Sequence, residues 1–377
     1  MDLSFWEKET YFNHFDVAII GSGIVGLSTA FYLKKKAPRL KVVVLERGIL
    51  PTGASSKNAG FACFGSPSEL LDDLDHLPEA EVYGLVARRW QGLQKLRQNL
   101  GDKALRYKGW GGYEVFGDEQ LFQTCADRLP ELNRALAPII GHPQVYERAD
   151  EEIKKFGLEE VRHLIRNRHE GQLDTGEMIL NLTRLVQRLG VIVLTGVNVE
   201  RVEETGQGVS LEARGNFCVQ ARQVLVATNG FARQLLPSLE VAPARAQVLI
   251  TAPIPKLRLK GTFHYDRGYY YFRNIGQRVL LGGGRNLDFA AEETATPGLT
   301  EKVQESLEKL LQTVILPGIP YRVEHRWSGI MGLGPSKATL IKPVSASVYC
   351  AVRMGGMGVA IGILVGEEAA DMLLQGR

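Results

Sequence analysis

The clearest pattern of apolar and polar positions lies in the first fifty residues. A short, mostly β-branched run at 16–20 ends in glycines, residues 24–36 repeat apolar positions at helical spacing, and a second apolar run occupies 42–45. These patterns predict a strand, a helix and a second strand. Parallel strands need such a crossover helix, so the segment predicts a buried parallel sheet and an α/β class.

The pattern changes from about residue 80 onward. Apolar residues recur at helical spacing over 82–100 and 121–136, which predicts helices of an inserted second domain. Alternating aromatic segments between 246 and 290 fit an antiparallel sheet with one exposed face. Further elements expected from apolar runs are a helix at 177–189, strands at 191–194, 197–202, 209–213 and 223–227, a helix at about 300–314, and a strand, glycine loop and helix within 348–374.

Composition excludes several classes of protein. The 377 residues are 45% hydrophobic and 23% charged, and the net charge of +3 is spread along the chain without a basic block. The absence of a basic block makes nucleic acid an unexpected partner. No bound metal is expected either, because the cysteines are isolated from one another. The acidic N-terminus does not resemble a signal peptide, and the apolar stretch 355–366 is too short to span a bilayer. We expect a cytoplasmic protein without membrane insertion.

A glycine motif follows the first predicted strand. Gly21, Gly23 and Gly26 form a G-x-G-x-x-G sequence, with Ile24 and Val25 between the last two glycines. Glu46 ends the next strand twenty positions after Gly26, where the acid that binds a nucleotide ribose is expected. The motif predicts a dinucleotide whose pyrophosphate faces the helix N-terminus, and the carboxylate disfavours the 2′-phosphate of NADP.

Such a unit binds NAD and FAD alike, so the choice of cofactor depends on other segments. A loop of small residues at 53–61 follows Glu46 and Arg47 and offers approachable amides and hydroxyls. Segments of similar kind recur in order along nearly the whole chain, at 171–178, 196–199, 224–230, 281–285, 327–330 and 355–360. Together with the glycine motif they resemble the D-amino-acid oxidase, glycine oxidase and sarcosine oxidase family of flavoproteins.

The resemblance implies noncovalent FAD, because no cysteine lies near Gly329, where some relatives attach the flavin. It also implies the fold, α/β (α+β overall): a Rossmann-type FAD-binding domain made of 1–83, 145–240 and 325–377, interleaved with an antiparallel-sheet substrate domain made of 84–144 and 241–324. Beyond the glycine motif, Glu46 and Arg47, the cofactor-binding residues implied are Ala54, Ser55, Ser56, Asn58, Ala59, Gly60, Phe61, Val199, Ala227, Thr228, Asn229, Gly230, Gly329, Ile330, Gly355, Gly356, Met357, Gly358 and Val359.

The substrate side departs from the family. Members that oxidise amino acids often hold the carboxylate with an arginine two residues after the glycine that matches Gly329, and Met331 stands there in this chain. A guanidinium grips a carboxylate bidentately, so Arg273, Arg285 and Arg326 are candidate replacements, although each is equally explained as a surface or ion-paired arginine. Tyr269 and Tyr271 are predicted to share one face of a strand, where they wall a substrate pocket or simply pack a sheet.

The resemblance implies oxidation of an amine or amino acid by hydride transfer to flavin N5, giving an imine, with oxygen or another acceptor reoxidising the flavin. The substrate nitrogen must be neutral, because an ammonium has no lone pair to expel the hydride, and no obligatory catalytic base is assigned. Two alternatives stay open: an FAD-dependent dehydrogenase of a 2-hydroxy acid, and a flavin-binding protein without turnover.

Overall fold

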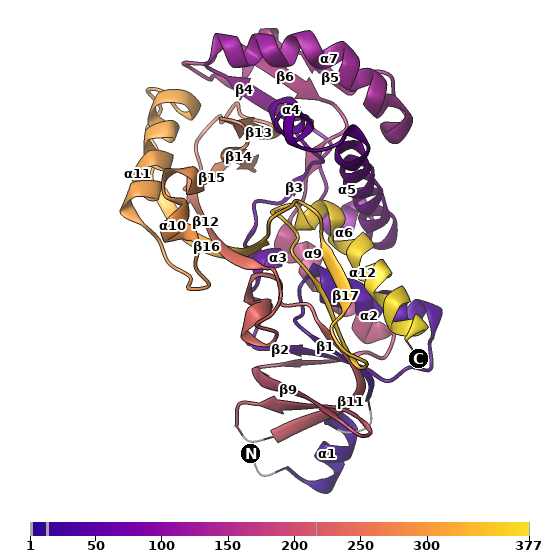
Figure 1. Cartoon of the computed structure of the whole chain (residues 1–377). Helices are drawn as coiled ribbons and strands as arrows, with labels where there is room; N and C mark the ends of the chain where they lie inside the picture. The colour runs from indigo at the N-terminus through magenta and orange to yellow at the C-terminus, as the bar shows by residue number, and fades with distance from the viewer. Residues whose placement is uncertain (1–2, 13–14, 216, 377) are drawn as a thin grey trace.

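The computed structural model describes residues 3–12, 15–215 and 217–376, and its two large sheets are bridged by helices (Figure 1). The first sheet has the order β17-β18-β11-β1-β2-β8, in which all neighbours are parallel except the edge strand β17. A hairpin of β9 and β10 extends from the first half of β11. The strands are β1 (Phe15–Ile20), β2 (Val42–Glu46), β8 (Ile192–Thr195), β9 (Val199–Thr205), β10 (Gly208–Ala213), β11 (Phe217–Val226), β17 (Leu340–Pro343) and β18 (Val348–Val352).

Helices α2 (Ile24–Lys36) and α12 (Gly358–Gln375) form the core next to this sheet, with α5 (Glu79–Leu100) and α9 (Thr175–Arg188) packed against them. Residues Ile24 to Leu33 are all buried, because α2 is enclosed on every side rather than on one stripe. A Cβ at Gly366 would lie 2.4 Å from the Ser28 side chain, so α2 and α12 can approach this closely only with glycine there.

The second sheet has the order β16-β12-β15-β14-β13-β4-β6-β5 and is antiparallel except between β13 and β4. Its strands are β4 (Gly112–Phe116), β5 (Tyr146–Arg148), β6 (His163–Asn167), β12 (Ala242–Thr251), β13 (Thr262–Tyr265), β14 (Tyr270–Ile275), β15 (Arg278–Gly283) and β16 (Val323–Leu333). The remaining α-helices and strands are α1 (Phe5–Tyr11), α3 (Ala54–Lys57), α4 (Pro67–His76), α6 (Asp102–Leu105), α7 (Glu119–Ile140), α8 (Ile153–Phe156), α10 (Phe289–Glu292), α11 (Glu301–Leu310), β3 (Phe61–Ala62) and β7 (Gly171–Gln172), and the short helical turns are η1 (Asp150–Glu152), η2 (Asn229–Gln234), η3 (Arg285–Leu287) and η4 (Leu311–Ile315).

The predicted fold class is confirmed: a parallel, helix-covered sheet is interleaved with a largely antiparallel one. The proposed division into domains stays a prediction. Strands from two segments of the expected cofactor domain, 145–240 and 325–377, lie in the second sheet instead of the first. β5 and β6 continue the second sheet beyond β4, and β16 pairs with β12. We expected these strands in the cofactor domain, and their apolar patterns do not distinguish one sheet from the other.

Candidate FAD and substrate site

One cavity of about 800 Å³ is lined by residues of both sheets. The first sheet contributes the turn after β1, the end of β2 and the loop between β18 and α12. The second sheet contributes parts of β12, β13, β14, β15 and β16. A long ligand that reaches from the glycine motif to the aromatic strands would therefore contact both halves of the fold.

The glycine motif forms one end of the cavity. Gly21, Gly23, Ile24 and Val25 line it, and Gly21 has a φ of +107°, a conformation that favours glycine. Gly26 does not line the cavity: a Cβ there would lie 2.0 Å from the carbonyl oxygen of Gly21, so its glycine is needed for the tight turn into α2.

Glu46 lines the same end of the cavity at the carboxyl end of β2, and it is 6% exposed. Its carboxylate accepts hydrogen bonds from the Ser22 hydroxyl at 2.7 Å, the Ser22 amide at 3.2 Å and the Gly48 amide at 3.0 Å. These three donors hold the carboxylate in place, as expected for the group predicted to bind a ribose. Arg47 also lines the cavity, with its guanidinium 3.8 Å from the centre of the Phe231 ring.

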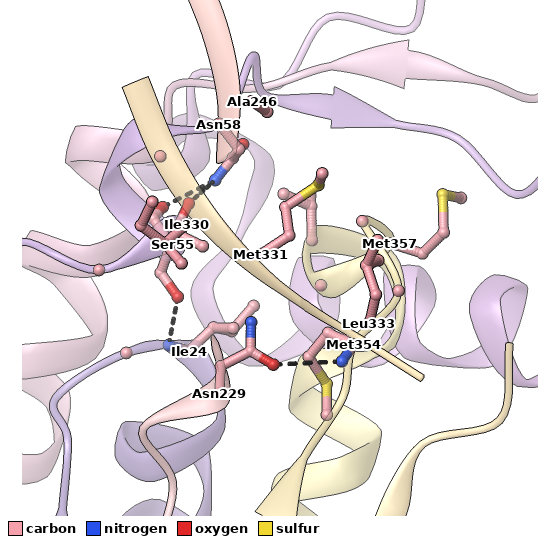
Figure 2. Close-up of a pocket in the computed structure, with 18 of the residues that line it drawn as sticks. Ile24, Ser55, Asn58, Asn229, Ala246, Ile330, Met331, Leu333, Met354 and Met357 are labelled. Atoms are coloured by element: carbon pink, nitrogen blue, oxygen red, sulfur yellow. Dashed lines mark hydrogen bonds between the residues drawn. The ribbon is translucent and has the colours of Figure 1, made fainter. Parts of the chain in front are cut away.

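Polar groups along the cavity wall fit a dinucleotide. The Thr228 hydroxyl is buried and has no hydrogen-bond partner among the described residues, although Thr228 lines the cavity. An unmade hydrogen bond of this kind costs about 1–3 kcal/mol, which a ligand oxygen would recover. Ser55 Oγ accepts a hydrogen bond from the Ile24 amide at 2.9 Å, and this bond ties the loop after β2 to the start of α2 (Figure 2). Ala227 and Val199 line the cavity as well.

The small-residue loop lies where the sequence suggested, with one exception. Ala54, Asn58, Ala59, Gly60 and Phe61 join Ser55 in lining the cavity. Asn58 donates hydrogen bonds to the carbonyl oxygens of Ala54 and Ser55 and accepts one from the Gly60 amide, which fixes the loop. Ser56 instead donates its hydroxyl to the carbonyl oxygen of Pro51 at 2.6 Å and does not line the cavity, because it faces the opposite side of the short helix α3.

The C-terminal half of the chain supplies the facing wall, and in the view of Figure 2 Met331 lies between Asn58 on one side and Met357 on the other. Asn229, at a φ of +47°, accepts hydrogen bonds from the amides of Arg353 and Met354 and so holds the start of the following glycine loop. The other wall residues predicted from sequence are Gly329, Gly355, Gly356, Gly358 and Val359.

Gly230 is the exception on this side, since it does not line the cavity. A Cβ at this position would lie 2.3 Å from the carbonyl oxygen of Met331, so the glycine allows η2 (Asn229–Gln234) to pack on β16. Met331 itself lines the cavity, and its sulfur would lie 3.6 Å from a Cβ at Gly356. The position that often holds an arginine in the family is therefore occupied by an apolar side chain next to the glycine loop.

Aromatic side chains enclose the opposite end of the cavity. Tyr269 and Tyr271 both line it, although Tyr269 precedes β14 and is 40% exposed. Burial raises the pKa of Tyr271 to about 12, so its hydroxyl stays protonated. The Phe61 ring packs edge-on against Tyr271, at 5.8 Å between centroids, and against His264, at 5.3 Å.

The three candidate arginines separate clearly. Arg285 lines the cavity and is partly buried, with its guanidinium 4.6 Å from the centre of the Phe289 ring and no carboxylate in salt-bridge contact among the described residues. Arg273 is 5% exposed and donates to the carbonyl oxygens of Gly60 and Leu173 behind the cavity wall. Burial lowers the pKa of Arg273 to about 10.

Arg326 is bonded to Glu308 and Gln304 on α11. Neither Arg273 nor Arg326 lines the cavity, which corrects their nomination as pocket residues. Arg326 bonds to α11 and so lies on the face of the second sheet that α11 covers. Arg273 follows Tyr271 by two residues on β14 and shares its strand face, but its guanidinium is engaged by the carbonyl oxygens of Gly60 and Leu173.

Sequence reasoning did not assign several polar residues of the cavity to the site. Asp73 and Lys337 form an ion pair at 2.5 Å, and both line the cavity. Glu69, Asp72 and His76 share α4 with Asp73, and the helical spacing of these charges was the only sequence feature that could have indicated them. Others that line the cavity are Lys57, Cys63, Asn198, Gln234, His264, Arg267 and Ser336.

The chain belongs to the family described as FAD dependent oxidoreductase, whose model matches residues 16–372. It is therefore an FAD-dependent oxidoreductase. Among the described residues, none of the helices combines the length and apolar character needed to cross a membrane.

The relatives are distant in sequence but match most of the chain. The gamma-glutamylputrescine oxidoreductase of Escherichia coli is 25% identical over 95% of this chain and 83% of its own length. The glycine oxidase of Geobacillus kaustophilus is 25% identical over 77% of this chain and 72% of its own. The crystal structure of an iminodiacetate oxidase from Chelativorans sp. BNC1 has the same fold, with a TM-score of 0.76, 19% identity and 95% coverage of both chains.

Proposed function

We propose that this protein oxidises an amine or amino acid with noncovalently bound FAD, giving an imine, and that oxygen or another acceptor reoxidises the flavin. The observation that carries the proposal is the single cavity that joins Glu46 and the glycine motif to the aromatic end around Tyr271. The names of the relatives support the substrate class, since they act on glycine, iminodiacetate and a putrescine derivative.

The residues for FAD follow from their places along the cavity. Glu46 would accept hydrogen bonds from the adenosine ribose, and Val199 lies at the same end. Thr228 and the amides at the start of α2 would meet the pyrophosphate. The loop 54–61 and the segments at 329–331 and 355–359 would enclose the flavin. When bound, FAD supplies the hydride acceptor.

The chain itself positions and desolvates the substrate. Phe61 and Tyr271 form an apolar wall that excludes water from one side, and cavity closure of this kind strengthens every polar contact inside. Of the three arginines nominated from the sequence, Arg285 is the one that lines the cavity, and it has no carboxylate in salt-bridge contact among the described residues, so it would bind a substrate carboxylate if there is one. Met331 leaves the wall next to the glycine loop apolar, which favours a substrate larger than glycine or D-alanine, or an amine without a carboxylate.

Anaerobic reduction of the flavin tests the proposal. Purified protein is mixed with gamma-glutamylputrescine, iminodiacetate, glycine, D- and L-amino acids, N-methyl amino acids and 2-hydroxy acids, and bleaching of the flavin band is followed. We expect saturable bleaching by at least one amine or amino acid. Bleaching by hydroxy acids alone, or by none of these compounds, would show that the proposed reaction is wrong.

A further inference from the structure

His264 is a buried histidine on the wall of the cavity. It lies on β13, is 7% exposed, and packs edge-on against Phe61 in the loop expected to enclose the flavin. Its Nε2 atom is buried and has no hydrogen-bond partner among the described residues. Buried polar atoms are nearly always paired, so an unpaired ring nitrogen on the wall of a cavity points to a ligand as its missing partner.

The other ring nitrogen faces a carboxylate. Nδ1 of His264 lies 3.9 Å from Oε2 of Glu69, which is too long for a hydrogen bond but close enough for the carboxylate to attract the ring once it is protonated. Glu69 is held at the start of α4, where its carboxylate accepts hydrogen bonds from the amide and hydroxyl of Ser66. The carboxylate favours the tautomer with hydrogen on Nδ1, which leaves the lone pair on Nε2.

Burial lowers the pKa of His264, while the nearby Glu69 acts in the opposite direction. The imidazole is therefore neutral at physiological pH, and Glu69 would stabilise the imidazolium once a proton arrives. The charged groups around this end of the cavity include one ion pair, Asp73 with Lys337, and Arg89 lies near Glu69. The remaining titratable groups that line the cavity here are Cys63, Asp72, His76, Arg267, Tyr269 and Tyr271.

We propose that His264, assisted by Glu69, accepts the proton of the substrate ammonium and so produces the neutral amine that is oxidised. An N–H bond of the ammonium breaks, its electron pair stays on the substrate nitrogen, and the proton forms a new bond to Nε2. The freed lone pair can then form the C=N bond as the carbon–hydrogen electron pair leaves as hydride. This inference rests on the proposed function, because it assigns a residue to that reaction.

The test compares the pH dependence of anaerobic flavin reduction in the wild type and in His264→Asn, with gamma-glutamylputrescine, glycine and iminodiacetate as probes. Without the histidine, the enzyme must capture the free amine, whose fraction rises toward an ammonium pKa near 10. We expect the reduction rate of His264→Asn to fall about 100-fold at about pH 7.5 and to come within about threefold of the wild type at about pH 10.5.

Two further variants separate proton transfer from a structural role. Imidazole added to His264→Gly should restore much of the rate, and Glu69→Gln, which removes the charge that stabilises the imidazolium, should lower the rate more at about pH 7.5 than at about pH 10.5. His325→Asn is the matched control, because His325 is an exposed histidine on β16 that does not line the cavity. FAD content and thermal stability of each variant show whether the fold is intact.

A measurement on the oxidised wild-type protein needs no turnover. Nitrogen NMR of protein labelled at its seven histidines should show one neutral ring with hydrogen on Nδ1 that is missing from His264→Asn. Equal rate losses at every pH, no rescue by imidazole, or hydrogen on Nε2 would overturn the role of His264 while leaving the proposed reaction intact. If no amine reduces the wild-type flavin, the proposed function fails and this inference fails with it.

Discussion

Removal of the Glu46 carboxylate should weaken FAD binding more than any other single change at the nucleotide end of the cavity. Glu46 is 6% exposed and is held by three donors, so its remaining lone pairs face the cavity in a fixed position. A hydrogen bond to a charged group contributes about 1.5–3 kcal/mol. Because each 1.4 kcal/mol is tenfold in Kd, Glu46→Ala should raise the Kd for FAD roughly 10- to 140-fold.

The assay is titration of apoprotein with FAD, followed by quenching of flavin fluorescence. Glu46→Gln keeps the shape and one acceptor, so its Kd should lie between those of the wild type and Glu46→Ala. Ser22→Ala is a matched control, since Ser22 is fully buried and does not line the cavity but donates to Glu46. It should raise the Kd by less than about tenfold, as for a neutral hydrogen bond that only orients the carboxylate. A Kd for Glu46→Ala within about twofold of the wild type would refute the assignment.

Three further outcomes are expected. Acid precipitation should release all flavin as FAD into the supernatant from the wild type and from Cys63→Ala alike, and a yellow pellet would contradict noncovalent binding. Arg285→Ala should raise KM for a carboxylate substrate at least tenfold with FAD affinity unchanged, whereas Arg273→Ala should mainly lower Tm; equal effects on KM would contradict the separation of the two arginines. Burial raises the pKa of Glu170 to about 8 and that of Glu114 to about 7, from an ordinary value of 4.5. Above pH 4.5 the folded state thus keeps protons that the unfolded chain has lost, so the free energy of unfolding should fall as the pH rises from 4.5 to about 8. Glu170→Gln should make this fall smaller. Measurement of Tm across this pH range tests both expectations.

The sequence by itself predicted most residues at the end of the cavity that we propose for the nucleotide. The turn at Gly21 and the close packing at Gly26 depend on local backbone geometry that only glycine allows, and Glu46 follows from the length of one strand–helix–strand unit. The spacing of apolar residues also predicted most helices and strands, because this spacing depends only on the geometry of one helix or one strand. The missing arginine at Met331 was visible in the sequence as well.

Only the tertiary structure decided how distant residues share the substrate end. Tyr271, Arg273 and Arg285 belong to the same aromatic and basic region, yet only Tyr271 and Arg285 line the cavity. Arg273 shares the strand face of Tyr271, but the carbonyl oxygens of Gly60 and Leu173, distant in sequence, hold its guanidinium behind the wall. His264 and Glu69 are separated by nearly 200 residues, and no local pattern relates them. The parallel pairing of β13 with β4 places His264 beside α4, since Glu114 of β4 is paired in register with His264 and binds Ser68 of that helix. Such contacts depend on strand order and register, which periodicity within one element does not specify.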